Sequence, residues 1–399
     1  MLAPNVLFLY TVGLVVGAII VSVAAASAVL TGALGLSPAF YGTLFIPFDV
    51  FAAAGAIGGG ALAHRLGLRR LLVLGLVTAA ASQAALAAAG LFPGAAGRWA
   101  FVAASLVGLA AGLSSSPLNT WPQVMFPRHR DAAVVMIHTL MTLGLAAGPL
   151  LVFAALRLGH FVLAPLLLVV TTLGFAALTS VQSFPPAEGH ADPTSPALAH
   201  TPRPLRRLTF WLFIAVTFLY EVGEAAFANW AVLFTEVEKG LSAATASLAL
   251  AAFWATLSLG RLLSSFLVRR LPAQRIWLTL PVFIAAALFW LPEAHAASGV
   301  LAGFAFAGLA CSAHYPLTMS LASARFPAHV AWTTGMVFAA NAAGAGVGSA
   351  LMGWLYESHS LSELYRWTTV APLVALVMSL WLVMRRRTHG SFTRPRPSE

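Results

Sequence analysis

The amino-acid sequence predicts an all-α membrane protein with twelve transmembrane helices, arranged as two six-helix halves related by pseudo-symmetry. Hydrophobic residues make up 60% of the 399 residues and charged residues only 9%, whereas a soluble protein carries about a quarter charged residues. Twelve apolar segments are long enough to cross a bilayer, and short motifs of the first half recur in the same order in the second half. We therefore expect the chain to face lipid over most of its surface.

Each predicted helix is an apolar segment near or above the ~20 residues that span the hydrocarbon core. The first segment begins too close to Met1, and runs too long, to be a cleaved signal peptide with a basic start. We expect it to remain as the first span. The twelve predicted spans cover residues 5–31, 39–63, 70–91, 99–122, 132–156, 160–182, 209–234, 241–268, 276–292, 297–323, 331–356 and 367–385.

A proline-rich polar stretch with a basic end, QSFPPAEGHADPTSPALAHTPRPLRR, follows the sixth segment. Such a composition is typical of a solvated linker between two structured parts. The predicted boundaries are 1–182 for the N-terminal half, 183–208 for a cytoplasmic linker, 209–388 for the C-terminal half and 389–399 for a cytoplasmic tail.

Two nearly identical hexapeptides show the internal repeat. FLYTVG at 8–13 becomes FLYEVG at 218–223, so that Glu221 stands where the first copy has Thr11. Two parallel halves of this kind enclose a site near the bilayer midplane in secondary carriers, and they expose it alternately to each side. Spaced glycines that allow helices to approach closely also recur, as Gly144, Gly148, Gly344 and Gly348.

The distribution of basic residues predicts the orientation in the membrane. With both termini in the cytoplasm, 17 arginines fall in the cytoplasmic loops and tail, and the opposite side holds Arg98, Arg157, Arg366 and Lys239. This asymmetry fits the positive-inside rule. Because the arginines are scattered among short loops, the net charge of +10 does not indicate nucleic-acid binding. We expect a monomer in the lipid bilayer of a bacterial inner membrane.

Three acidic residues, Asp49, Glu221 and Glu224, lie well within predicted spans. A charged group at the bilayer centre costs about 2.5–3.5 kcal/mol, so we expect these side chains to face the interior of the bundle. Glu221 and Glu224 are three residues apart, and Tyr220 precedes Glu224 by four, so the three share a helical face. Two carboxylates this close do not both ionise easily. We predict that these acids couple transport to protons; structural hydrogen bonds are the alternative.

Further polar and aromatic residues within the spans are candidates for the same site. His138 and His314 could relay protons, or could pack as hydrogen-bonded residues. Pro316 is expected to break its helix and free backbone carbonyls. Asparagines and aromatic residues within the spans could line a cavity and bind a substrate. The alternatives are hydrogen bonds between helices, plain packing, and a position in the aromatic belt at the membrane interface. The predicted substrate-binding residues are Tyr220, Trp254, Asn119, Asn229, Tyr315, Asn341 and Trp230.

Arg261 lies toward the cytoplasmic half of the eighth span. We expect it to form a structural or gating ion pair with one of the glutamates. Binding of an anion and snorkelling of the side chain to the interface are the alternatives.

No enzyme chemistry is predicted. The sequence has no phosphate-binding glycine loop followed by lysine, no CxxC, no histidine and glutamate spacing for a metal, and no nucleophile elbow. We therefore expect no cofactor and no bound metal. Without an ATP-binding motif, the energy for transport must come from an ion gradient or from the gradient of the substrate.

The loop GALAHRLGLRR at 60–70 resembles a motif of the major facilitator superfamily, with His64 at the position where that family has aspartate. The resemblance implies twelve helices in two halves and a loop that latches the halves on the cytoplasmic side. The matching residues are Gly60, Arg65, Gly67, Arg69 and Arg70.

Within that superfamily, the seventh and eighth spans resemble the fucose permease group of sugar–proton symporters. That group has carboxylates on its first and fourth helices, where this chain has Thr11 and Asn119 instead, so a proton site would have moved to Asp49 or to the glutamates. A glycine-proline element at 144–149 resembles the fifth-helix motif of proton-coupled exporters. The residues similar to the fucose permease group are Tyr220, Gly223, Glu224, Trp230, Phe253, Trp254, Gly260 and Arg261.

The leading functional prediction is proton-coupled uptake of a small polar solute, such as a sugar, by alternating access. Proton-antiport export of an apolar or cationic compound is the alternative, which the aromatic and acidic residues of the spans would suit. A sensor built on a carrier fold is a third class, for which the sequence contains no appended domain.

Overall fold

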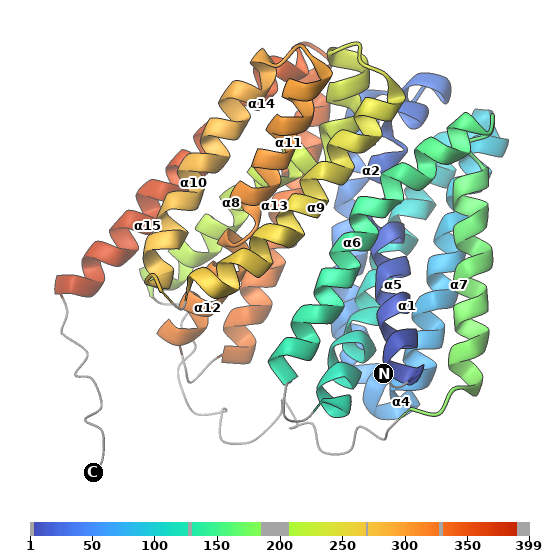
Figure 1. Cartoon of the computed structure of the whole chain (residues 1–399), viewed down its shortest axis with the longest axis horizontal. Coiled ribbons are helices and arrows are strands. Elements are labelled where there is room, and N and C mark those ends of the chain that lie inside the picture. Colours follow the sequence, from blue (N-terminus) through green and yellow to red (C-terminus); the bar gives the residue numbers. More distant parts are fainter. Residues whose placement is uncertain (1–3, 127–129, 185–206, 269, 327–329, 389–399) are drawn as a thin grey trace.

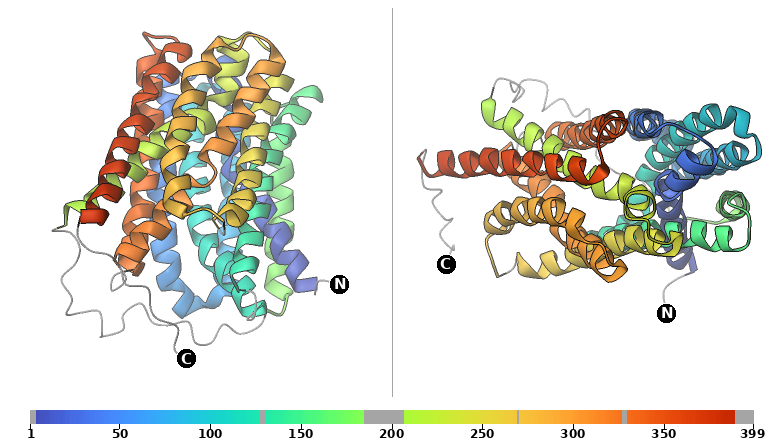
Figure 2. Two further views of the ribbon diagram at one scale, coloured as in Figure 1. Left: turned by 60° about the vertical axis from the view of Figure 1, so that its left-hand side comes forward. Right: turned by 90° about the horizontal axis from the view of Figure 1, so that it is seen from above.

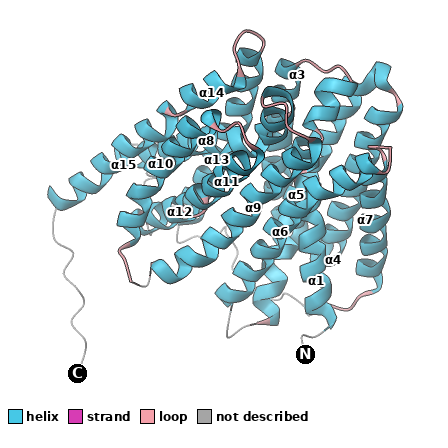
Figure 3. Ribbon diagram, turned by 45° about the horizontal axis from the view of Figure 1, so that its top comes forward, coloured by secondary structure: helices cyan, strands magenta, loops and turns pink. Residues whose placement is uncertain are grey.

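The computed structural model of the chain describes residues 4–126, 130–184, 207–268, 270–326 and 330–388. Every regular element within these ranges is a helix, as Figure 3 shows by colour. The elements are α1 (Pro4–Ile20), α2 (Ser22–Ala25), η1 (Val29–Ala33), α3 (Pro38–Thr43), α4 (Phe45–Leu91), η2 (Pro93–Ala95), α5 (Ala96–Met125), α6 (Arg130–Arg157), α7 (Leu163–Val181), α8 (Leu208–Leu233), η5 (Phe234–Glu238), α9 (Ala243–Leu267), α10 (Ala273–Trp290), η6 (Leu291–Glu293), α11 (Ala297–Cys311), α12 (His314–Arg325), α13 (Val330–Tyr356), α14 (Leu361–Thr368) and α15 (Val370–Thr388).

The all-α membrane architecture is confirmed. Within the described residues, 11 helical stretches are long and apolar enough to cross a membrane, and a shorter apolar helix covers Asn5–Ile20. That shorter helix begins the first predicted span, which continues through α2 and η1. The predicted linker 183–208 lies outside the described residues except at its two ends, and the predicted tail 389–399 lies wholly outside them.

Some predicted spans differ in detail from the observed helices. The first span consists of α1, α2 and the π-helical η1, and the tenth is divided between α11 and α12. Conversely, the predicted loop between the second and third spans is helical, and α4 runs through it with one non-helical residue, Gly67, at φ 78° and ψ 155°. This region of backbone space is essentially confined to glycine, so the kink requires a glycine at this position.

The helices form two bundles, α1–α7 and α8–α15. Figures 1 and 2 show that the bundles approach each other at the end remote from the N-terminus. At the opposite end, where α1 begins and where α7 and α15 end, the bundles stand apart. We call these the closed end and the open end.

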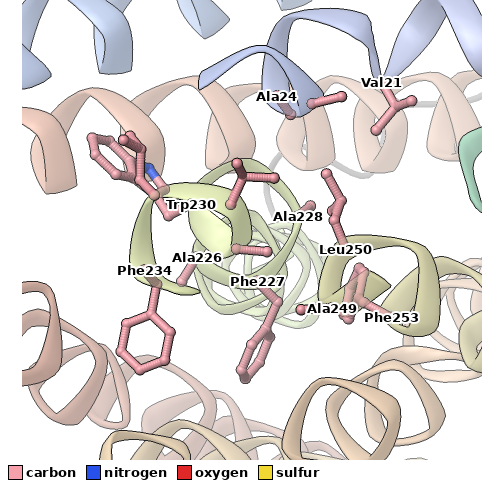
Figure 4. Packing of buried hydrophobic residues seen from close by; sticks show 14 of the residues in the cluster. Val21, Ala24, Ala226, Phe227, Ala228, Trp230, Phe234, Ala249, Leu250 and Phe253 are labelled. Atoms are coloured by element: carbon pink, nitrogen blue, oxygen red, sulfur yellow. The ribbon is translucent and has the colours of Figure 1, made fainter. Parts of the chain in front are cut away.

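Hydrophobic packing accounts for the closed end. One cluster of buried residues there contains both halves, including Val21 and Ala24 from the first, and Ala228 and Leu250 from the second. Figure 4 shows Val21 and Ala24 on the side of α8 and α9 that carries Ala228 and Leu250. Burial of apolar surface is the main favourable term in such packing wherever water is the alternative. The shared cluster therefore holds the halves together at this end.

At the open end, each half has a hydrophobic cluster of its own. Leu9, Val12 and Leu76 belong to a cluster formed only by the first half. Phe210 and Trp277 belong to one formed only by the second half. Because no buried cluster joins the halves here, the described residues adopt a conformation closed at one end and open at the other.

Glycines pack equivalent helices in both halves. A Cβ on Gly144 of α6 would collide with the Leu14 carbonyl of α1, and a Cβ on Gly344 of α13 would collide with the Phe218 carbonyl of α8. The fifth predicted span therefore packs on the first as the eleventh packs on the seventh. This equivalence supports the pseudo-symmetry that the repeated glycines predict.

Close contact between the halves at the closed end also depends on glycine. A Cβ on Gly353 of α13 would lie 3.1 Å from the Cα of Gly42 on α3, and still closer to the Pro38 carbonyl oxygen. Beside this contact the Tyr41 hydroxyl donates a hydrogen bond to the Asn229 carbonyl at 2.5 Å, from the first half to the second. Backbone contact and a polar bond therefore supplement the apolar cluster.

We predict that Gly353→Val opens the closed end, because the added side chain cannot fit between α3 and α13 without moving backbone. The reporter is Phe45→Cys, which replaces a side chain 6% exposed in the shared cluster, in a Cys311→Ser background. Its reaction with a membrane-impermeant maleimide should be several-fold faster with Gly353→Val. Gly335→Val, on the same helix with no atom within 4 Å of its Cβ position, is the matched control. Equal rates for the two glycine variants would contradict the prediction.

Candidate functional site

A cavity of about 430 Å³ lies between the halves toward the open end. Small-molecule sites commonly occupy about 300–1,000 Å³. On α9 its lining residues recur every three or four positions, and so they share one helical face. The full lining is His138, Thr139 and Thr142 from α6, Ser258, Arg261, Ser264 and Ser265 from α9, Val268 directly after α9, and Tyr315, Pro316 and Leu317 from α12.

The interruption between α11 and α12 provides free backbone carbonyls next to this cavity. The Cys311 carbonyl accepts a hydrogen bond from the Tyr220 hydroxyl at 2.8 Å. The Ser312 carbonyl accepts one from Arg261 Nε at 3.3 Å. The local break that Pro316 predicts is therefore present, because a proline nitrogen cannot donate to the preceding turn.

The two glutamates of α8 lie beyond the cavity, toward the closed end, and neither lines it. Glu221 is partly exposed and accepts a hydrogen bond from the side-chain amide of Asn341 on α13. Glu224 is 7% exposed and accepts one from the Tyr220 hydroxyl. Tyr220 and Glu224 therefore share a face, as the spacing predicts, whereas Glu221 is held by α13.

Asp49 approaches the same region from the first half. Its Oδ2 lies 3.2 Å from the position that a Cβ on Gly346 of α13 would take. This oxygen is buried and has no hydrogen-bond partner within the described residues. Gly346 follows Asn341, the α13 residue that bonds Glu221, by five positions. One acid from each half thus approaches the same part of α13.

Arg261 makes no salt bridge with the acids in the part of the chain that the structure describes. The ion pair found within the described ranges joins Arg366 and Glu293 in exposed positions. Arg261 Nε is hydrogen-bonded instead to the Ser312 carbonyl. Its predicted gating role therefore stays a prediction.

The two histidines occupy different surroundings. His138 Nε2 lies 2.9 Å from Asn119 Oδ1, which joins α6 to α5 beside the cavity. His314 is fully buried. Its ring stacks between those of Tyr220 and Trp277, at centroid distances of 4.7 Å and 5.9 Å. Neither of its ring nitrogens has a hydrogen-bond partner in the described part of the chain.

The predicted asparagines connect helices of the second half. Asn229 on α8 donates from its side-chain amide to the Ser349 hydroxyl on α13 at 2.8 Å. Asn341 on α13 donates in the opposite direction, to Glu221 on α8. Both contacts fit the helix-bridging alternative for these residues.

The predicted tryptophans belong to the shared hydrophobic packing. Trp230 is fully buried, with its ring edge-on to Tyr41 of the first half at 5.2 Å. Trp254 is half-buried, packs against the same cluster and lies edge-on to Phe253 at 5.1 Å. Of the predicted substrate-binding residues, Tyr315 lines the cavity.

Three predicted latch residues surround the kink in α4. Arg65, Arg69 and Arg70 are exposed, on either side of Gly67. The side chain of His64 lies outside those that the structure describes. The predicted latch between the halves therefore stays a prediction.

The hydroxyl residues of the cavity wall were not predicted. Ser258, Ser264 and Ser265 on α9 and Thr142 on α6 line it. A signal for them exists in the sequence, because serines at three-residue spacing on each side of Arg261 must share its helical face.

A family model described as Major Facilitator Superfamily matches residues 7–301. The chain belongs to the major facilitator superfamily. It is accordingly a multi-pass membrane transporter rather than an enzyme. No curated protein matches the chain significantly.

Solved structures of several transporters share the fold of this superfamily member. A bacterial homologue of the human lysosomal transporter Spinster, in an inward-facing and occupied conformation, is 15% identical with a TM-score of 0.73, covering 96% of each chain. A nucleoside transporter, NupG, is 13% identical with a TM-score of 0.76, covering 96% of this chain and 100% of the other. A D-xylose–proton symporter is 16% identical with a TM-score of 0.72, covering 95% of this chain and 96% of the other.

We predict that Tyr220→Phe destabilises the transporter by about 1–3 kcal/mol, because it removes a hydroxyl that is hydrogen-bonded to buried groups. The lost partners are the Glu224 carboxyl group and the Cys311 carbonyl. The measurement is thermal unfolding of purified protein in detergent. Tyr10→Phe is the control, since the Tyr10 hydroxyl makes no hydrogen bond within the described residues. A similar loss for both variants would show that the bonds of Tyr220 contribute nothing specific.

Proposed function

We propose that this transporter moves a small polar solute together with protons, and that the acids at the boundary between the halves carry the protons. The observation that supports this most is the position and the hydrogen bonding of the carboxyl groups of Glu221 and Glu224. Both carboxyl groups lie within the membrane-spanning part, both accept a hydrogen bond from a neutral side chain, and neither forms an ion pair with another described residue.

The energetics of burial favour proton exchange at these groups. An ionised carboxylate that is removed from water without a cationic partner is costly, and it is relieved when the group becomes neutral. Water that enters from the open end would hydrate and stabilise the ionised form. A cycle that alternates between hydrated and closed surroundings would therefore bind and release a proton on each turn.

Asp49 links this chemistry to movement of the halves. It belongs to the first half, whereas Glu221 belongs to the second, and their charges repel when both are ionised. Protonation of either acid would remove the repulsion and favour close contact of α4 with α13. We therefore propose that protonation of these acids is coupled to the movement that brings the two halves together.

The proposed direction is uptake across a bacterial inner membrane, with both termini in the cytoplasm. In that orientation the open end faces the cytoplasm, and the present conformation is the one from which a solute would be released. The D-xylose–proton symporter and the nucleoside transporter with the same fold support a polar solute, with a sugar as one class.

Export of a cationic compound in exchange for protons is a second candidate. The excess of acids over bases within the spans between the halves favours it, since Asp49, Glu221 and Glu224 stand against Arg261 alone among the described residues. Proton flux distinguishes the two candidates by sign. In reconstituted vesicles, solute and protons move in the same direction for symport and in opposite directions for antiport.

We predict that Glu221→Gln and Glu224→Gln each abolish proton-driven accumulation while they retain solute counterflow. Counterflow exchanges solute across the membrane without net proton movement, so an amide that cannot exchange a proton still supports it. The solute is the compound that stabilises purified protein most in a thermal-shift screen of sugars, nucleosides, organic cations and organic acids.

Glu357→Gln is the control for this experiment, because Glu357 is exposed at the closed end. It should leave both activities at the wild-type level. Accumulation that survives at more than about half the wild-type rate in both glutamine variants would rule out the proposed proton role.

A further inference from the structure

The guanidinium group of Arg261 has donors that no protein group uses in the described part of the chain. A guanidinium carries five N–H donors in a planar fork. Within the described residues, its hydrogen bond to a protein acceptor runs from Nε to the Ser312 carbonyl. The terminal nitrogens have no acceptor there, and Arg261 lines the cavity between the halves.

Other free donors surround the same space. Ser258, one turn before Arg261, and Tyr315 on α12 both line the cavity and make no hydrogen bond through their hydroxyls within the described residues. The hydroxyls of Ser264 and Thr142 instead donate to backbone carbonyls, each at 2.8 Å. The groups available to a ligand therefore include a cation and two hydroxyl donors, with the imidazole of His138 on the same lining.

The described lining of the cavity contains no acidic side chain. The glutamates of α8 lie beyond it, held by Tyr220 and Asn341. A cationic ligand in the cavity would meet the charge of Arg261 directly, which costs free energy. An anionic ligand would meet the free edge of a guanidinium, the group best suited to bind a carboxylate through two parallel hydrogen bonds.

The remaining wall of the cavity is apolar. Val268, Pro316 and Leu317 form it, together with the ring of Tyr315. A ligand that fills the cavity would therefore place a hydrophobic part against the apolar wall at α12, and a polar or charged part beside Arg261 on α9. Burial of that hydrophobic part contributes binding free energy in proportion to its area.

We propose that the cavity binds a small amphipathic organic anion, with its carboxylate on Arg261 and its apolar body against α12. This proposal deepens the proposed function, since it narrows the small polar solute to a carboxylic acid instead of a neutral sugar. Binding itself does not require that the proposed proton role is correct.

The position of the acids explains how protons and an anion would be coupled. Ionised glutamates on α8 neutralise part of the field of Arg261 and repel a carboxylate, whereas protonated ones do neither. Proton binding and anion binding are therefore cooperative, each raising the affinity for the other by the same factor. The titratable groups that interact with Arg261 are His138 on α6, Glu221 and Glu224 on α8, Cys311 on α11 and Tyr315 on α12, with Asp49 on α4 acting through Glu221.

The test uses two sets of probes that share a body and differ in charge. One set is 3-phenylpropionate, 3-phenylpropionamide and 3-phenylpropylamine, and the other is butyrate, butyramide and butylamine. Thermal unfolding of the full-length protein in detergent is measured at pH 6 over a concentration series. We expect a saturable rise in melting temperature with at least one acid, and no comparable rise with its amide or amine.

Substitution of Arg261 assigns the effect to the cavity. Arg261→Gln should weaken binding of that acid by roughly ten- to a hundredfold, the range expected for loss of a hydrogen bond to a charged group. Arg261→Lys keeps the charge but not the fork, and should bind with intermediate affinity. Arg275→Gln, which removes an exposed arginine outside the cavity, should bind as the wild type does.

Several outcomes would overturn the proposal. The anion site is ruled out if the acid raises the melting temperature of Arg261→Gln as much as that of the wild type. It is also ruled out if an amide binds as well as its acid. A larger shift with the amine favours the cation exporter instead, and the absence of any Arg261-dependent shift with both acids also rejects the inference. Proton-driven accumulation of a neutral solute that depends on Glu221 would leave the proposed function intact, so the two failures are distinguishable.

Discussion

The cost of placing polar groups in hydrocarbon determines the organisation of this protein. In the membrane interior an unpaired carbonyl, carboxylate or guanidinium finds no water, so the chain must bring each one to a partner or to a hydrated space. The charged side chains of the candidate site discussed above accordingly lie where the two halves face each other. Glu221 of α8 is held by Asn341 on α13, and Arg261 of α9 by the Ser312 carbonyl at the break before Pro316. Asp49 of α4 faces Gly346 of α13, and its buried Oδ2 has no hydrogen-bond partner within the described residues. The apolar surfaces that remain can face lipid.

Packing and polar chemistry thus divide the molecule by depth. At the closed end, Trp230 and Tyr41 combine apolar contact with a hydrogen bond between the halves. The acids lie next to this layer on the side of the open end, and the cavity that contains Arg261 lies still closer to the open end. Glycine contacts such as Gly42 with Gly353 allow the helices of opposite halves to touch through their backbones. The transporter therefore has, in sequence along one axis, a packed layer that joins the halves, a layer that contains the acids, and the cavity that we propose as the binding site.

Composition and hydropathy were sufficient to predict the membrane-spanning helices, because lipid imposes a minimum apolar length on every helix. The internal repeat predicted the two similar halves and their equivalent glycine contacts, and Pro316 predicted the interruption before α12. The pairing of side chains was harder to predict from the sequence. That Glu221 contacts Asn341 while Glu224 contacts Tyr220 depends on the rotation of α8 against α13, which spacing along one helix does not define. The cavity wall was overlooked because serines bear no charge and are common in membrane helices as backbone-bonded residues.

The two halves are alike in helix order but differ in their fourth spans. The fourth span of the first half is the continuous helix α5, whereas its counterpart in the second half is divided into α11 and the 12-residue α12. A short helix that is joined to α11 through an interrupted segment has a joint about which it can tilt. Because Tyr315, Pro316 and Leu317 stand at the joint and form one wall of the cavity, tilting of α12 alone would tighten or loosen the grip on a bound molecule. Occlusion of the ligand can then precede the larger rocking of the bundles, and the second half would perform it by itself.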